Sequence, residues 1–271
     1  MSNLFLQPIN WGSFGIVVAI VAVLSILFGA LIVLISKLCA VKENEKISAI
    51  QDKLAGANCG GCGFAGCADF AKAVVEGKAD ISACGPTPNQ NKKEISEILG
   101  IPFNETEQAY AVVKCSGGEL SEDIYEYIGN KGCIQQAIYM DGKKKCPSGC
   151  MGGGTCVSLC PYHAVKIVNG VAVVDKALCE ACGLCVRNCP HSLIELIPTS
   201  SKVYVACSTT CKGKEVTSAC KAGCIGCGIC AKVCPEGAIT MVNNLPVIDY
   251  KKCTGCLTCV SKCPRKVIKE I

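Results

Sequence analysis

The spacing of the cysteines constrains this chain more than any other feature of its sequence. Cysteine fills 26 of the 271 positions. Two runs toward the C-terminal end follow C-x2-C-x2-C-x3-C-P, which is the ligand spacing of cubane iron–sulfur clusters. Where two such runs occur together, the fourth cysteine of each run binds the other cluster. The spacing therefore predicts two [4Fe-4S] ligand sets, namely Cys224, Cys227, Cys230 with Cys263 and Cys253, Cys256, Cys259 with Cys234.

An earlier segment repeats this pattern at a fixed distance. Five cysteines that begin at Cys160 return 74 positions later, beginning at Cys234, and self-similarity at one period indicates duplicated structural units. Asn169-Gly170 lies between the two runs of the earlier unit, and Asn243-Asn244 lies between those of the later unit. Such residue pairs favour a tight hairpin turn. Each unit is therefore expected to be a ferredoxin-like module of short strands and helices around two clusters.

The first cysteine run of the earlier unit departs from the usual spacing. It reads C-x3-C-x5-C-x3-C-P, and its residues 151–155 are interpreted as an insertion that enlarges a cluster loop. A glycine run at a helix start can also hold a phosphate, but cysteines fix both ends of this loop. The expected ligand sets are Cys146, Cys150, Cys156 with Cys189 and Cys179, Cys182, Cys185 with Cys160.

A further set of four cysteines precedes both units. Cys59, Cys62, Cys67 and Cys84 follow C-x2-C-x4-C-x16-C with glycines between them, and glycine lets the backbone turn tightly and point amide hydrogens at sulfur. The alternative is a zinc knuckle, but zinc sites usually join two matched C-x2-C pairs. Here the fourth ligand stands alone, so the spacing favours a fifth [4Fe-4S] cluster.

Six cysteines have no place in these five sets: Cys39, Cys115, Cys133, Cys207, Cys211 and Cys220. No subset of them has a recognised cluster spacing. Cys115 and Cys133 are interpreted as small buried thiols. A sixth site that joins Cys207, Cys211 and Cys220 to one of them is left open. His163 and His191 are not at ligand positions, and no catalytic residue is expected.

The N-terminal segment is long and apolar enough to cross a membrane. The first 36 residues carry no charged side chain, and Phe14 to Ile35 is uninterrupted by any ionisable group; about 20 such residues cross the hydrocarbon core. An export signal would need a basic start and an A-x-A-like cleavage site, and neither is present. Lysines begin at Lys37, so the positive-inside rule predicts a single pass through the cell inner (cytoplasmic) membrane, with the N-terminus outside and the cluster domains in the cytoplasm.

These features together predict an α+β chain in six parts. A helix is expected over 43–54, another over 92–99 and a strand over 110–114. The parts are a transmembrane anchor (1–37), a juxtamembrane helix with the C-x2-C-x4-C-x16-C domain (38–90), a connecting segment (91–145), a first ferredoxin-like module (146–200), a connector (201–220) and a second ferredoxin-like module (221–271).

Charge and aromatic content argue against a nucleic-acid partner. The net charge is only +5, and aromatic residues make up 5% of the chain, whereas nucleic-acid binding calls for a strongly basic surface with stacking aromatics. One basic run, Lys143 to Lys145, precedes Cys146. It is interpreted either as a surface that steers an acidic protein or as a solvated loop.

The order of these parts resembles the RnfB family, whose members belong to the Rnf complex, a membrane-bound ion-translocating ferredoxin:NAD oxidoreductase. The likeness is to the longer form with two ferredoxin modules. The resemblance implies an electron-transfer subunit that accepts electrons from reduced soluble ferredoxin and passes them to partner membrane subunits and ultimately to NAD. It also implies that the complete site for NAD reduction lies outside this chain, which has no strand-G-x-G-x-x-G-helix context. A membrane-anchored polyferredoxin for another redox enzyme is the alternative, and a zinc-binding structural protein is a remote one.

Overall fold

The computed structural model describes residues 11–38, 44–102, 105 and 107–271, in two compact units, Met1–Glu45 and Lys46–Ile271. In the first unit, α1 (Trp11–Leu38) is one continuous helix. Its Phe14–Lys37 stretch has a mean hydropathy of 3.2, and none of it is buried within the chain. By length and composition this helix can span a bilayer, as the sequence predicts. Cys39 and Glu43 lie outside the described residues.

A small helical domain begins the second unit. It contains α2 (Glu45–Lys53), α3 (Cys67–Val75), the 3-10 helix η1 (Ile81–Ala83) and α4 (Asn89–Leu99). Ile50, Phe70 and Ile95 are its most deeply buried side chains. Gly100 ends α4 in the left-handed conformation at φ 69°, which glycine adopts without a steric cost. The two helices expected in this region are thus present as α2 and α4.

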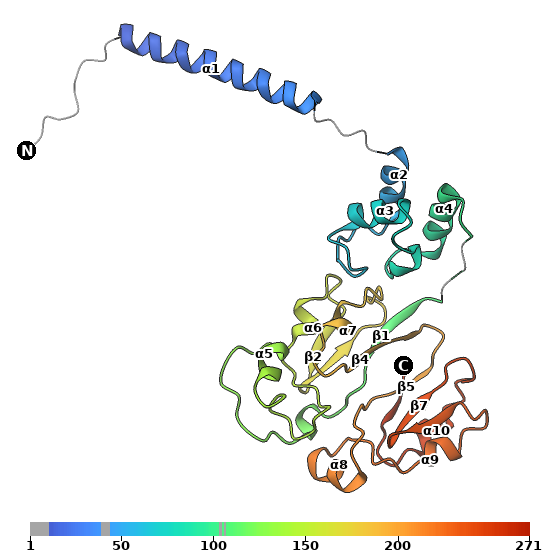
Figure 1. Ribbon diagram of the computed structural model, residues 1–271. Coiled ribbons are helices and arrows are strands. Elements are labelled where there is room, and N and C mark those ends of the chain that lie inside the picture. Colours follow the sequence, from blue (N-terminus) through green and yellow to red (C-terminus); the bar gives the residue numbers. More distant parts are fainter. Residues whose placement is uncertain (1–10, 39–43, 103–104, 106) are drawn as a thin grey trace, which may run out of the picture. The chain divides into compact units, whose positions relative to one another are not determined.

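Two similar modules follow, as the repeat predicts. The first contains β1 (Ala109–Val113), the 3-10 helix η2 (Gly118–Leu120), α5 (Cys133–Ile138), α6 (Thr155–Ser158), β2 (Val165–Val168), β3 (Val171–Val174), α7 (Leu184–Arg187) and β4 (Ile194–Pro198). The second contains β5 (Val203–Val205), α8 (Gly213–Ala219), α9 (Ile229–Lys232), β6 (Ile239–Val242), β7 (Leu245–Ile248), α10 (Thr258–Lys262) and β8 (Ile268–Glu270). Figure 1 shows the two sets in the same chain order.

Each module contains the hairpin that the sequence predicts. Strand β2 pairs with β3, and β6 pairs with β7, both antiparallel. The four turn residues, Asn169-Gly170 and Asn243-Asn244, all have positive φ, which is what a type I′ hairpin turn requires.

A second strand pair closes each module with residues from outside the repeat. Strand β1 pairs with β4, and β5 pairs with β8, again antiparallel. The sequence predicts a strand at 110–114, but the expected domain bounds put it in the connecting segment (91–145). They put the residues of β5 in the connector (201–220). The structure instead makes both strands part of the modules, because their apolar side chains are buried there. We therefore take the modules to begin near residues 109 and 203.

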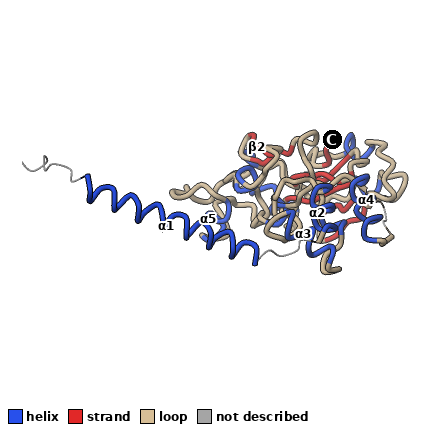
Figure 2. The backbone as a smooth tube through the Cα atoms, turned by 90° about the horizontal axis from the view of Figure 1, so that it is seen from above, coloured by secondary structure: helices blue, strands red, loops and turns tan. Residues whose placement is uncertain are grey.

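The modules have small cores that include their cysteines. Loops form most of the second unit (Figure 2), and the buried cluster of the first module contains Cys150 and Cys185 beside short aliphatic side chains. Cys230 and Cys259 are the buried cysteines in the cluster of the second module. Between the modules, Tyr110 packs with Tyr204 and Tyr250. With so little apolar core, the energy of metal binding contributes to folding.

Candidate iron–sulfur sites

The second module brings together the two expected cysteine sets. Cys234, Cys253, Cys256 and Cys259 line a hollow of about 10 Å³. In the other set, burial raises the pKa of Cys230, and the negative thiolates of Cys263 and Cys227 raise it further. Burial also raises the pKa of Cys224, and the thiolates of Cys230 and Cys263 add to that effect. Each set therefore presents four thiols to one small space.

One set in the first module also matches expectation. Burial raises the pKa of Cys185 to about 12, and the neighbouring thiolates of Cys179, Cys182 and Cys160 add to this effect. Such mutual perturbation requires the four sulfurs to lie close together. Iron binding would displace the protons of these four thiols, as metal binding does at other thiolate sites.

The remaining set of the first module differs from the expected one. A hollow of about 20 Å³ is lined by Cys133, Cys150, Cys156 and Cys189, without Cys146. The structure therefore does not place Cys146 with these residues, although the spacing predicts it, and it places Cys133 there, contrary to its interpretation as a small buried thiol.

The repeat supplies the physical reason. Cys150 and Cys156 also lie 74 positions before Cys224 and Cys230, so residues 151–155 are not an insertion. Glycine at 153 occupies the position of Cys227. A Cβ there would collide with the carbonyl of Lys131 and approach the nitrogen of Cys133 to 2.8 Å. The segment that carries Cys133 fills this space, so Cys133 lies where the second module has its second cysteine. The sequence contained this signal in the position of Gly153.

Hydrogen bonds to sulfur recur at the Cys-Pro corners. Cys160 accepts from the N–H of Ala164 at 3.4 Å, and Cys189 and Cys263 accept from the residue four positions on at 3.3 and 3.4 Å. The third residue after each Cys-Pro cysteine has positive φ in all four corners, which turns the chain back over the sulfur. Amide hydrogens placed in this way stabilise a thiolate and the cluster it holds.

The four expected cysteines of the helical domain have similar support. Cys62, Cys67 and Cys84 pack against the core of α3 and α4. Thr87 Oγ1 donates to Cys84 Sγ at 3.1 Å, and the N–H of Gly61 donates to Cys59 Sγ at 3.4 Å. The sulfurs of Cys84 and Cys59 therefore each have a hydrogen-bond donor beside them.

The helical domain and the first module meet at their cysteine loops. A Cβ at Gly61 would press on the carbonyl of Cys182, and one at Gly85 would collide with the carbonyl of Ala181. Tyr162 lies at this contact, where burial and then the thiolates of Cys59 and Cys182 raise its pKa. The loops that hold two cysteine sets are thus in direct contact.

The donor sets fit a cubane cluster. All cysteines in the described part of the chain are free thiols, and each of the four module sets brings its thiols together. Within the described ranges, no three His, Cys, Asp or Glu side chains are grouped so as to hold a single metal ion.

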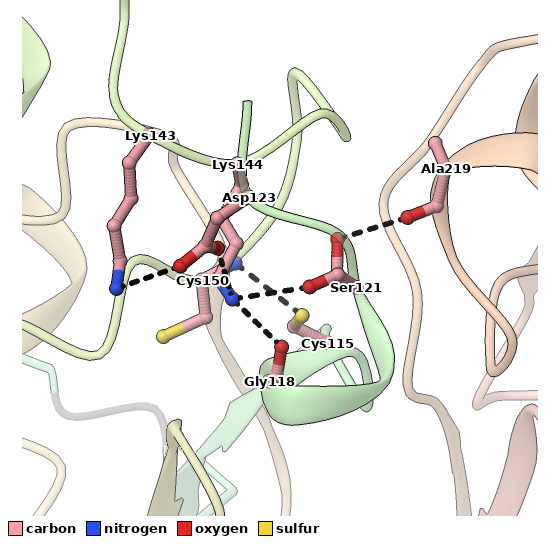
Figure 3. Close-up of polar contacts among 8 residues, drawn as sticks. All are labelled: Cys115, Gly118, Ser121, Asp123, Lys143, Lys144, Cys150 and Ala219. Carbon is pink, nitrogen blue, oxygen red and sulfur yellow. Dashed lines mark hydrogen bonds and ion pairs between the residues drawn. The ribbon is translucent and has the colours of Figure 1, made fainter. Parts of the chain in front are cut away.

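The basic run before Cys146 is engaged in ion pairs. Lys143 and Lys144 bind Asp123 at 2.9 and 2.7 Å (Figure 3), and Lys145 binds Glu122 at 2.8 Å. The Lys144 side chain is only 8% exposed. These lysines therefore hold loops together, and the suggestion of a docking surface for an acidic protein receives no support.

Three protein-family models match parts of the chain. An Fe-S cluster model matches residues 54–86, a 4Fe-4S binding domain matches residues 172–195, and a 4Fe-4S dicluster domain matches residues 223–267. The atypical run from Cys146 to Cys160 lies outside these three matches, in agreement with its altered ligand.

Three proteins resemble the chain over nearly its whole length. It is 40% identical to the B subunit of the ion-translocating oxidoreductase complex of Methanosarcina acetivorans over 254 residues, which are 93% of this chain and 96% of the relative. It is 38% identical to the B subunit of the Na(+)-translocating ferredoxin:NAD(+) oxidoreductase complex of Acetobacterium woodii, over 93% of this chain and 76% of the relative. It is 36% identical to the B subunit of the proton-translocating ferredoxin:NAD(+) oxidoreductase complex of Clostridium ljungdahlii, over 94% of this chain and 92% of the relative.

Proposed function

The chain belongs to the RnfB family, the B subunits of ion-translocating ferredoxin:NAD oxidoreductase complexes, and on that premise we propose which of its residues hold clusters and which partners it serves. It is an electron-transfer subunit of a redox translocase, and it lacks a complete active site of its own. Its part in the reaction is to hold and shield electron carriers at fixed places between a donor and the partner subunits.

The proposed ligands form five sets of four cysteines. The observation that carries this assignment is the convergence of thiols in each of the four module sets. When bound, a [4Fe-4S] cluster exchanges one electron with little rearrangement. The sets are Cys59, Cys62, Cys67, Cys84; Cys133, Cys150, Cys156, Cys189; Cys160, Cys179, Cys182, Cys185; Cys224, Cys227, Cys230, Cys263; and Cys234, Cys253, Cys256, Cys259.

The names of the relatives and the apolar helix support the proposed partners. Relatives are named as subunits of complexes that act on ferredoxin and NAD, so we assign reduced soluble ferredoxin as the donor and membrane subunits of the same complex as acceptors. Helix α1 anchors the chain in the lipid bilayer of the inner membrane. Lys37 in its last turn supports an N-terminus outside and cluster domains in the cytoplasm.

Metal analysis of the anaerobically purified chain tests the assignment. We expect iron and acid-labile sulfide in equal amounts, and we expect Cys133→Ser to lower both by about four atoms per chain, because one cubane contains four of each. Cys39→Ser is the control, since this residue belongs to no set. Stoichiometric zinc without sulfide would overturn the electron-transfer assignment, and unchanged iron in Cys133→Ser would restore Cys146 to the set.

A further inference from the structure

We propose that Cys115, Cys146, Cys207 and Cys220 form a sixth [4Fe-4S] site, held jointly by the two modules; the inference rests on the proposed function of this chain as a cluster carrier. All four cysteines line one hollow of about 70 Å³. The hollows beside two of the assigned sets measure about 20 and 10 Å³. The hollow at these four cysteines is thus larger than the hollows at the two assigned sets. We call these four residues the junction set.

Two members of the junction set occupy equivalent positions in the repeat. Cys146 and Cys220 are 74 positions apart, and each precedes the first cysteine of its module's run by four residues. Cys146 is available for another role because Cys133 takes its expected place beside Cys150. The duplication therefore placed one such cysteine in each module.

The other two members are also equivalent to each other. Cys115 follows β1 and Cys207 follows β5, each two residues beyond the end of the strand. The N–H of Cys150 donates to Cys115 Sγ at 3.4 Å, and the N–H of Cys224 donates to Cys207 Sγ at 3.4 Å. Each module thus contributes two matched thiols, the arrangement expected where two similar units share one interface site.

The four thiols lie close to one another. Burial raises the pKa of Cys146 to about 11, and the thiolates of Cys207, Cys115 and Cys220 raise it further. Cys115 and Cys220 act on the pKa of Cys207 in the same direction. A Cβ at Gly117 would stand 3.3 Å from Cys220 Sγ and 3.6 Å from Cys115 Sγ, so glycine at this position lets these two sulfurs converge.

A buried hydroxyl at the hollow has no partner in the protein. Ser116 lines the hollow, and its Oγ is buried without a hydrogen bond to any described residue. Leaving such a group unpaired costs free energy. A cluster sulfide or cysteine thiolate in this hollow would accept a hydrogen bond from the Ser116 hydroxyl. In the assigned sites, backbone N–H groups donate to sulfur in the same way.

Polar contacts tie together the segments that carry the junction set (Figure 3). Lys144 Nζ donates to the carbonyls of Gly118 and Ser121 at 2.9 and 3.2 Å, which joins the Cys146 segment to the one after Cys115. Ser121 Oγ donates to the carbonyl of Ala219 at 3.2 Å, beside Cys220. Three of the four ligand segments are therefore fixed to one another by a nearly buried ammonium and a hydroxyl.

A second pair of contacts repeats in both modules. His191 Nδ1 bonds the carbonyl of Gly149 at 2.7 Å, and Arg265 Nε donates to the carbonyl of Gly223 at 3.1 Å. These residues and their acceptors are again 74 positions apart. Arg265 Nη2 also donates to the carbonyl of Cys220 at 2.8 Å. In each module, the residue that follows a Cys-Pro pair, His191 or Arg265, thus fixes the loop that carries Cys146 or Cys220.

Cys211 is the natural control, because it lines the same hollow but lacks the other features. It is absent from the thiols that act on the pKa of Cys146 and of Cys207. A cluster at the junction set would supply one-electron exchange between the modules, which the five assigned sets do not span.

Iron and sulfide analysis of the full-length chain decides the inference. Six clusters give about twenty-four irons and five give about twenty, so the intact chain separates the two even if a variant fails to fold. We expect Cys220→Ser to lose about four irons and one component of the potentiometric electron paramagnetic resonance titration. Cys211→Ser should keep both.

The outcomes separate this inference from the proposed function. About twenty irons in the intact chain, or equal iron in Cys220→Ser and the wild type, would overturn the sixth site and leave the five sets intact. Loss of iron in Cys211→Ser but not in Cys220→Ser would also overturn the junction set. Zinc without sulfide would instead overturn the proposed function itself.

Discussion

At the scale of single residues, the hydroxyl of Tyr162 stands out among the buried polar groups. It is buried and has no hydrogen-bond partner in the described part of the chain. It is near the thiols of Cys59 and Cys182, where the helical domain meets the first module. Once clusters occupy both sets, their sulfurs are the acceptors within reach. A hydrogen bond to cluster sulfur stabilises the more negative, reduced state and so raises the reduction potential.

We therefore expect Tyr162→Phe to lower one cluster's reduction potential. If the hydrogen bond is about 1.4 kcal/mol stronger in the reduced state, the shift is on the order of 60 mV for one electron. A potentiometric titration followed by electron paramagnetic resonance measures it. Tyr125→Phe is the control, because that hydroxyl donates to the carbonyl of Tyr139 at 2.8 Å, away from the cysteine sets. Identical potentials in wild type and Tyr162→Phe would exclude this role.

At the scale of elements, the start of α5 places Cys133 beside three other cysteines of the first module. Cys133 is the first residue of α5, and its N–H donates to Thr155 Oγ1 at 2.8 Å. Thr155 begins α6, which follows Gly153 and Gly154. Helices α5 and α6 are thus hydrogen-bonded to each other beside Gly153, at the position where the second module has Cys227.

We expect Gly153→Ala to displace Cys133 and to cost about four irons per chain. The added methyl group would collide with the carbonyl of Lys131 and crowd the nitrogen of Cys133. Metal analysis and the number of titrating clusters measure the effect. Ser158→Ala in the neighbouring helix α6 is the control, since its hydroxyl is exposed and bonds only within α6. Full iron content in Gly153→Ala would argue that this loop can move aside without loss of the ligand.

The repeat explains how much of the fold could be predicted. Both hairpins and the ligand sets of the regular runs follow from spacing alone, because turn residues and cysteine positions act locally. The sequence did not indicate the partners of β1 and β5, because those strands come from outside the period and pair with distant residues. Cys133 was missed for a related reason: it replaces a ligand through space, and Gly153 was the only local sign that a ligand was missing from the run.

At the scale of the whole molecule, the membrane helix and the cysteine-rich body are separate compact units. Every cysteine assigned above lies within Lys46–Ile271, and the Phe14–Lys37 span contains none of them. The anchor therefore contributes location, while the body contributes the sites.

We expect a chain without residues 1–43 to be released from the membrane with unchanged iron content. The reason is that the second unit contains its own buried cores and all the assigned thiols. Membrane fractionation and metal analysis of the truncated and full-length proteins measure the two effects. Loss of iron in the truncated protein would mean that the anchor segment also supports the cluster domains.

The sharing of one site by two modules has a consequence for biosynthesis. A chain emerges from the ribosome N-terminus first, and its domains generally fold in that order. The helical domain has its last ligand at Cys84, the first module at Cys189, the junction set at Cys220 and the second module at Cys263. The junction set is thus completed before any ligand of the second module's own two sets has been made. Cofactor insertion can therefore begin at the helical domain during translation, whereas the Cys220 segment waits for Arg265, which donates to the carbonyl of Cys220.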